Sequence, residues 1–151
     1  MNNSAFKIQS RKNALLVTVV LLLDFITKAW FFDANFILIP NVLKLYGTKN
    51  YGAAFSFLAT YPQYVTLLSV CLIAIIVYMC SQAMGVMLNI ALSLVLGGAL
   101  GNFLDRLTRG YVVDFIQTLF INFPVFNIAD ICITIGAALS CIAVLFFEKN
   151  D

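Results

Sequence analysis

The sequence predicts an all-α membrane protein with four transmembrane helices, and three observations lead to that prediction. Of the 151 residues, 62% are hydrophobic and only 11% are charged, whereas a soluble domain is nearer half apolar and a quarter charged. The apolar residues are gathered into four runs, each close to the ~20 residues that cross the hydrocarbon of a bilayer. The length is that of one domain, so we expect residues 1–151 to form a single polytopic membrane domain.

The first helix is expected at about residues 14–32. A polar segment with three basic residues precedes it: Lys7, Arg11 and Lys12. A cationic start before an apolar run is also typical of a cleaved signal peptide. However, this run is too long, contains Asp24 and Lys28, and lacks a convincing cleavage site of small residues after it. We therefore interpret it as a retained transmembrane helix.

A long loop is expected over residues 33–61. Within it, two short apolar stretches in residues 36–50 flank Pro40 and Asn41. Runs of this length around turn residues are typical of strands. The loop is therefore expected to contain two short strands joined by a turn.

The other three helices are expected at about residues 62–81, 86–104 and 129–147, with Pro62 suited to a helix start. The loop between the last two, residues 105–128, carries four charged residues: Asp105, Arg106, Arg109 and Asp114. The third helix carries glycines whose spacing permits close contact between helices, namely Gly97, Gly98 and Gly101.

Four crossings place both termini on the same side of the membrane. The short flanks on the two sides carry equal numbers of Lys and Arg, but the first helix usually dominates orientation. The basic residues before that helix indicate the cytoplasmic side. We therefore expect cytoplasmic termini and two long loops on the extracytoplasmic face.

Composition also excludes several classes of function. The net charge of +2 and the lack of a basic run with interleaved aromatics argue against nucleic-acid binding. The chain has no histidine, which removes the usual base of serine intramembrane proteases and the ligands of zinc metalloproteases. The cysteines lie inside apolar runs without zinc-type spacing and are interpreted as small buried hydrophobes: Cys71, Cys80, Cys132 and Cys141. We expect no metal and no cofactor.

Two charged clusters have helical spacing. Asp24 and Lys28 are four residues apart and share one helix face, where they can neutralise each other in lipid. Asn102, Asp105 and Arg106 repeat this geometry at the outer end of the third helix, and Arg106 can also hold a carboxylate with a two-pronged fork. For both clusters a supporting role is preferred to direct chemistry.

Asp114 and Asp130 differ from these two clusters, because neither has a basic residue at helical spacing. Carboxylates near a bilayer are energetically costly, and those that are retained there usually have a function. For Asp130 a helix cap is the structural alternative. If the two meet around a water ~4 Å apart, they repel by about 4 kcal/mol, so one keeps its proton near neutrality. Such a pair supplies a base and an acid for amide hydrolysis. Candidates to orient the substrate and the oxyanion are Asn50, Asn102, Asn127 and Arg106.

Five blocks in order along the whole chain resemble the lipoprotein signal peptidases, also called signal peptidase II. They lie at residues 24–28, 50–56, 98–106, 110–115 and 126–130. The resemblance implies an aspartyl endopeptidase of the bacterial inner membrane, which cleaves diacylglyceryl-modified prolipoproteins just before the lipidated cysteine. It also implies inhibition by the cyclic peptide globomycin.

By the same resemblance, Asp114 and Asp130 are the catalytic dyad, and the strand-forming loop is a small extracytoplasmic β-cradle. A lipid-anchored substrate would arrive laterally through the bilayer, so the site is expected at the outer interface. The residues implied to line or support it are Asp24, Lys28, Asn50, Gly52, Gly101, Asn102, Asp105, Arg106, Asn127 and Ala129.

Two interpretations from other functional classes also fit this sequence. A four-helix small-solute or ion transporter would use an acidic residue in its first helix, and Asp24 is such a residue. Against it, Asp24 has Lys28 as an internal partner, and the polar residues gather at one edge of the membrane instead of its midplane. A non-enzymatic scaffold would not need the paired carboxylates.

Overall fold

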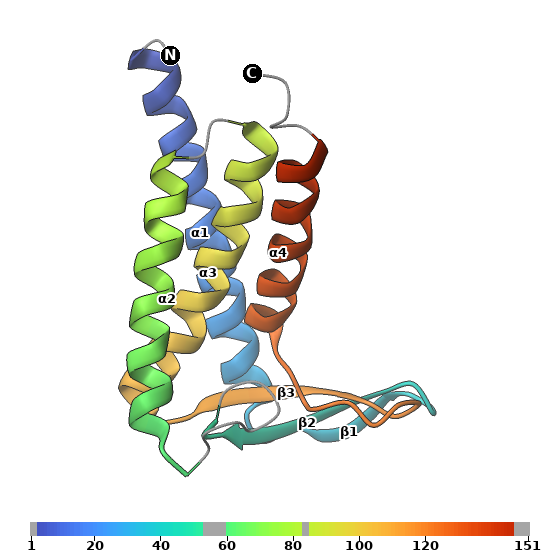
Figure 1. Cartoon of the computed structure of the whole chain (residues 1–151). Coiled ribbons are helices and arrows are strands. Elements are labelled where there is room, and N and C mark those ends of the chain that lie inside the picture. The colour runs from blue at the N-terminus through green and yellow to red at the C-terminus, as the bar shows by residue number, and fades with distance from the viewer. Residues whose placement is uncertain (1–2, 53–59, 83–84, 147–151) are drawn as a thin grey trace.

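The computed structural model shows four helices side by side, with a small sheet across one end of the bundle (Figure 1). It describes residues 3–52, 60–82 and 85–146. The elements are α1 (Asn3–Phe31), β1 (Asn35–Ile39), β2 (Leu43–Asn50), α2 (Pro62–Gln82), α3 (Val86–Arg109), β3 (Val112–Thr118) and α4 (Ile128–Phe146). The predicted fold class is confirmed.

All four helices are long and apolar enough to cross a membrane. Half of the apolar stretch of α3 is buried, against 6% for α2 and 17% for α4. Large side chains such as Leu67, Ile75 and Leu145 are exposed along α2 and α4. Exposed apolar surface on this scale marks contact with lipid or protein. The chain is thus a multi-pass membrane protein with α3 as its central helix.

Two helix boundaries differ from the expectation. The first helix begins at Asn3, not near residue 14, because backbone hydrogen bonding continues through the polar segment before the apolar stretch that starts at Arg11. The third helix continues beyond residue 104 to Arg109. It ends at Gly110, which has a φ of 79° and donates its N–H to the Arg106 carbonyl, a common way for a helix to end.

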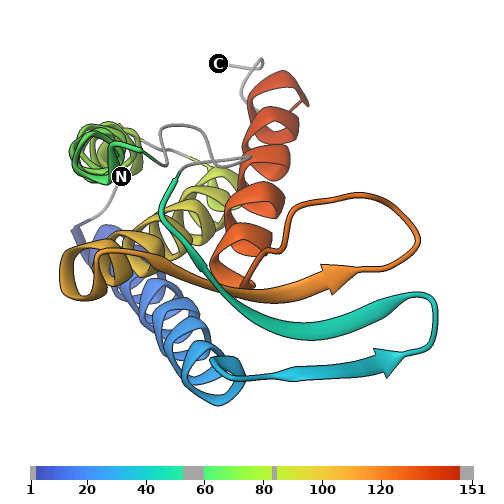
Figure 2. The same cartoon turned by 90° about the horizontal axis from the view of Figure 1, so that it is seen from below.

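The sheet has the order β1-β2-β3 and is antiparallel throughout. The two expected strands are present, and the turn between them contains Asn41 with a φ of 59°. The third strand, β3, was not expected, since residues 105–128 were interpreted as a loop. Seen from the sheet end, the strands run across the bundle and extend beyond the helices on one side (Figure 2).

Small residues bring α3 close to its two neighbours. A Cβ on Gly97 would lie 2.8 Å from the side chain of Val20 on α1, and one on Gly98 would clash with the Ala129 carbonyl on α4. Such contacts rely on backbones approaching without side chains between them. They fix α1, α3 and α4 as one unit beneath the sheet.

Candidate active site

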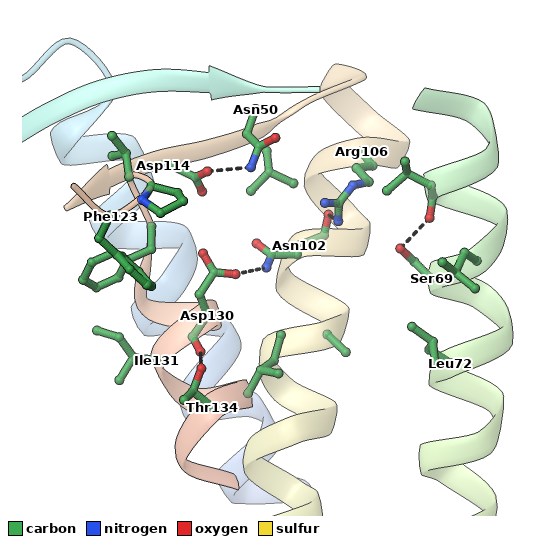
Figure 3. Close-up of a pocket in the computed structure, with 18 of the residues that line it drawn as sticks. Asn50, Ser69, Leu72, Asn102, Arg106, Asp114, Phe123, Asp130, Ile131 and Thr134 are labelled. Carbon is green, nitrogen blue, oxygen red and sulfur yellow. Dashed lines mark hydrogen bonds between the residues drawn. The ribbon is translucent and has the colours of Figure 1, made fainter. Parts of the chain in front are cut away.

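A cavity of about 620 Å³ opens where α2, α3 and α4 meet the sheet. Asp114 and Asp130 point towards it from different elements, with Asn50, Asn102 and Arg106 nearby (Figure 3). Apolar side chains of α2 and α4 line the rest of its wall, among them Val65, Leu68, Leu72, Ile131 and Ile135. The cavity is therefore polar at the sheet end and apolar along the membrane-spanning helices.

Asp114 lies on β3 and is only 2% exposed. Its Oδ1 accepts a hydrogen bond from Asn127 Nδ2 at 2.7 Å, and its Oδ2 accepts one from Asn50 Nδ2 at 2.9 Å. Asn50 pairs with Val112 in the sheet register, so Asp114 is its diagonal neighbour on the same face. The pairing of β2 with β3 thus places an amide donor beside this carboxylate.

Asp130 lies in the first turn of α4 and is half-buried. Its Oδ1 accepts from Asn102 Nδ2 at 2.8 Å, and its Oδ2 accepts from the Asn127 backbone N–H at 3.1 Å. Its own N–H donates to Asn127 Oδ1 at 2.9 Å. This exchange is a capping box, so Asp130 makes the cap contacts considered above and also faces the cavity.

Asn127 connects the two aspartates. It is fully buried, and its side-chain amide also donates to Asn102 Oδ1 at 3.1 Å and to the Val113 carbonyl at 3.3 Å. Because Asn127 contacts Asp114 through its side chain and Asp130 through its backbone, it fixes the position of one carboxylate relative to the other.

The electrostatics favour a proton on this pair. Burial first, and then the neighbouring charge of Asp130, raise the pKa of Asp114 from 3.8 to about 7, although the hydrogen bonds from Asn50 and Asn127 act in the opposite direction. Desolvation and a like charge both disfavour the ionised form. Near neutral pH the site therefore holds a carboxyl that is readily protonated or ionised.

The guanidinium of Arg106 donates to backbone carbonyls, and not to a carboxylate in a bidentate pair. Its Nη2 donates to the Gly52 carbonyl at 3.0 Å and its Nη1 to the Asn102 carbonyl at 3.2 Å. Gly52 N–H in turn donates to Asn50 Oδ1 at 3.0 Å. Within the described residues, the buried Nε of Arg106 has no hydrogen-bond partner, and Arg106 is one of the residues that line the cavity.

A second charged cluster lies behind the cavity. Lys28, 1% exposed, contacts Asp24 Oδ2 at 2.6 Å and Asp105 Oδ2 at 3.0 Å. Asp24 Oδ1 accepts from the Ala129 N–H at 3.0 Å, which ties α1 to α4. A Cβ on Gly101 would lie 2.6 Å from Asp24 Oδ2. Asp24, the residue that favoured a transporter, is thus buried in an ion pair.

Asp105 ties the start of β3 to the end of α3. Its Oδ1 lies 3.4 Å from Arg109 Nε, and its Oδ2 accepts from the Val113 N–H at 3.3 Å. Since Asp114 follows directly, this bond helps to place it.

The predicted site residues thus divide into two groups. Those that line the cavity are Asn50, Asn102, Arg106, Asp114 and Asp130. Those that lie behind it in contact with the first group or with one another are Asp24, Lys28, Gly52, Gly101, Asp105, Asn127 and Ala129. The apolar wall and the backbone role of Val113 were not predicted, because nothing in an apolar run distinguishes a side chain that lines a cavity from one that faces lipid.

Comparison with known proteins gives the family. The sequence model described as signal peptidase (SPase) II matches residues 16–146. The chain belongs to the signal peptidase II family. Its relatives in that family are named lipoprotein signal peptidase. The protein from Streptococcus agalactiae serotype Ia is 40% identical over 143 residues, which cover 89% of this chain and 93% of that protein.

Other members of the signal peptidase II family agree. The lipoprotein signal peptidase of Shouchella clausii is 40% identical, with 91% and 95% of the two chains covered, and that of Serratia proteamaculans is 43% identical, with 82% and 80% covered. A solved structure described as a bacterial membrane enzyme, obtained by the in meso method at 2.3 Å resolution, has a TM-score of 0.83 at 32% identity, with 93% of each chain covered. This chain is therefore a multi-pass membrane peptidase of the lipoprotein signal peptidase family.

Proposed function

We propose that this peptidase is of the aspartic type, with Asp114 and Asp130 as its catalytic dyad. It removes the signal peptide from diacylglyceryl-modified prolipoproteins by cleaving the amide bond before the lipidated cysteine. The observation that carries the proposal is the pair of carboxylates from β3 and α4 that face one cavity and share Asn127 as a hydrogen-bond donor. The chain acts as a single polytopic domain.

The charge balance of the cluster supports one shared proton. The connected carboxylates are Asp24, Asp105, Asp114 and Asp130, and the cations are Lys28, Arg106 and Arg109. Carboxylates outnumber cations by one, so the cluster is neutral when one carboxyl is protonated. Burying a net charge is costly, and the raised pKa of Asp114 agrees with a proton on the dyad near neutrality.

The chemistry then needs only the dyad and a water molecule. The ionised carboxylate takes a proton from water as its oxygen attacks the scissile carbonyl carbon, while the protonated carboxyl gives its proton to the carbonyl oxygen. The resulting tetrahedral intermediate collapses as the carboxyl that took the proton from water passes it to the amide nitrogen, while the other carboxylate takes a proton back from a hydroxyl of the intermediate. This releases the cysteine amine and the carboxyl group of the signal peptide, and it returns the dyad to its starting state. Arg106 lines the cavity, and its guanidinium charge is suited to stabilise the negative charge that develops on the carbonyl oxygen during the attack of water.

The cavity suits a substrate that arrives within the bilayer. Its apolar wall includes Leu68 and Leu72 of α2 and Ile135 of α4, which are suited to apolar segments of a lipidated peptide. We place the sheet on the extracytoplasmic face of the bacterial inner membrane and both termini in the cytoplasm. In support, the start of α1 and the end of α4 lie at the end of the bundle opposite the sheet (Figure 1). We expect globomycin to inhibit cleavage by binding in this cavity, and we expect no nucleic-acid partner.

The test is cleavage of a purified lipidated prolipoprotein, followed by gel shift and by mass spectrometry of the new N-terminus. Asp114→Asn and Asp130→Asn should each abolish cleavage, while the unlipidated precursor should remain uncut. Asp33→Asn, at an exposed position away from the dyad, controls for the loss of one carboxylate. Cleavage that persists in either dyad variant would refute the assignment, and a product that does not begin at the cysteine would refute the cleavage position.

A further inference from the structure

Three carboxamides surround the dyad, and each is oriented by a group that can only donate. Asn50 Oδ1 accepts from the Gly52 N–H at 3.0 Å, and Asn127 Oδ1 accepts from the Asp130 N–H at 2.9 Å. Asn102 Oδ1 accepts from Lys28 Nζ at 3.0 Å. An amide whose oxygen is engaged must present its NH₂ group elsewhere, and each of these three presents it to an aspartate.

Lys28 stands apart among these orienting groups, because the other two belong to the backbone. An ammonium has three donors and no acceptor, so the atom of Asn102 that faces it must be the oxygen. The nitrogen of Asn102 must then face Asp130 Oδ1, which it does at 2.8 Å. Lys28 itself is buried and held by Asp24 and Asp105, so this donor has a fixed position.

Asn127 gives Asn102 a second but weaker restraint. Its Nδ2 donates to Asn102 Oδ1 at 3.1 Å, but the same two hydrogens also face Asp114 Oδ1 at 2.7 Å and the Val113 carbonyl at 3.3 Å. The bond from Lys28 is charge-assisted, and such bonds are about twice as strong as neutral ones. Lys28 is therefore the main determinant of the Asn102 orientation.

We propose that Lys28 is a positioning residue: by fixing the Asn102 amide it holds Asp130 in the orientation that catalysis requires. This inference rests on the proposed function of Asp130. Without the ammonium, rotation of the Asn102 amide would place its oxygen against the Asp130 carboxylate and remove one of the donors to it. The effect travels from α1 through α3 to α4, although Lys28 does not line the cavity formed by the described residues.

The competing explanation is that Lys28 only neutralises Asp24 and Asp105. A double-substitution cycle separates the two, because only the positioning role passes through Asn102. The four proteins are the wild type, Lys28→Met, Asn102→Ala and the double variant. For each, kcat and KM are measured on a lipidated prolipoprotein, and thermal unfolding is measured in the same detergent.

We expect Lys28→Met to lower kcat by about 100-fold, the order of loss that follows a small misplacement of a reacting group. We expect KM to stay within about twofold, since Lys28 does not touch the cavity. In the Asn102→Ala background the same substitution should lower kcat by less than about threefold. The unfolding temperature should fall equally in both backgrounds, because the ion pairs are lost in both. An equal loss of kcat in the two backgrounds would overturn the proposal.

Lys28→Met leaves two buried carboxylates with less compensation, so the cycle is repeated with Asp24→Asn in all four proteins. That change removes one carboxylate, while its amide oxygen still accepts from the Ala129 N–H.

Failure of the proposed function can be distinguished from failure of the positioning role. Failure of the proposed function would appear as an inactive wild type or an active Asp130→Asn variant. Failure of the positioning role would leave those results intact and make the kcat cycle additive.

Discussion

The buried carboxyl of Asp114 makes stability depend on pH in a direction that can be measured. Its pKa rises from 3.8 to about 7 on folding, so over this range the folded chain holds a proton that the unfolded chain releases. The stabilisation is fully present below the unfolded pKa and is lost as the pH rises through about 7. From pH 5 to pH 9 the loss from this one group is about 3 kcal/mol.

The substitution Asp114→Asn removes the ionisation at nearly constant volume. Asn50 and Asn127 both donate to this side chain, so the new NH₂ group faces one donor, at a cost of about 1–2 kcal/mol at every pH. The variant should therefore be less stable than the wild type at pH 5 and more stable at pH 9. For a chain of this size the relative unfolding temperature should rise by about 5–10 °C between the two.

The assay is thermal unfolding in detergent, followed by circular dichroism at pH 5, 7 and 9. The exposed Asp33→Asn variant corrects for the change of net charge. A difference between Asp114→Asn and the wild type that is the same at all three pH values would show that this carboxyl does not titrate near 7, and the shared-proton reasoning would then fail.

Three further predictions concern the site and its support. The value of kcat/KM should fall about tenfold per pH unit above about 7, as the dyad loses its proton; a flat profile up to pH 9 would contradict the role of Asp114. Asn127→Ala should lower kcat by about 100-fold and more than Asn50→Ala does, since the Asn127 side chain donates to Asp114 and accepts from the Asp130 N–H, whereas that of Asn50 contacts Asp114 alone of the two. Steady-state cleavage assays compare the two variants, and an equal loss would argue against the bridging role. Gly98→Ala should destabilise the fold by about 1–3 kcal/mol, because the new Cβ would meet a carbonyl oxygen of α4. Gly85→Ala is the control, because a Cβ there meets nothing within 4 Å. Thermal unfolding of the two variants is the measurement, and a tolerated Gly98→Ala would count against the tight α3–α4 contact.

The helices were predictable because the bilayer requires each spanning segment to satisfy its own backbone. Composition and length then suffice, and only the ends of α1 and α3 were misplaced. The strand β3 was not predictable in this way, since its hydrogen bonds go to β2, where Thr48 pairs with Asp114. Aspartate is uncommon within strands, so local preference also pointed away from a strand at that position.

The candidate site shows the same division between local and remote contacts. The pairing of Asp24 with Lys28 follows from their spacing on one helix. The contacts of Lys28 with Asp105 and Asn102 cross from α1 to α3 and have no signature in the sequence. The contact of Arg106 with the Gly52 carbonyl is of the same kind, because only the folded chain brings the end of β2 to α3.

The reciprocal cap at the start of α4 has a consequence for inhibitor design. Oδ2 of Asp130 is engaged by the very N–H that begins the helix, so a compound that captures this oxygen must compete with helix initiation. Arg106 lines the same cavity, and its buried Nε has no hydrogen-bond partner among the described residues. Compounds that approach from the Arg106 side and leave the first turn of α4 undisturbed should therefore gain affinity at lower conformational cost.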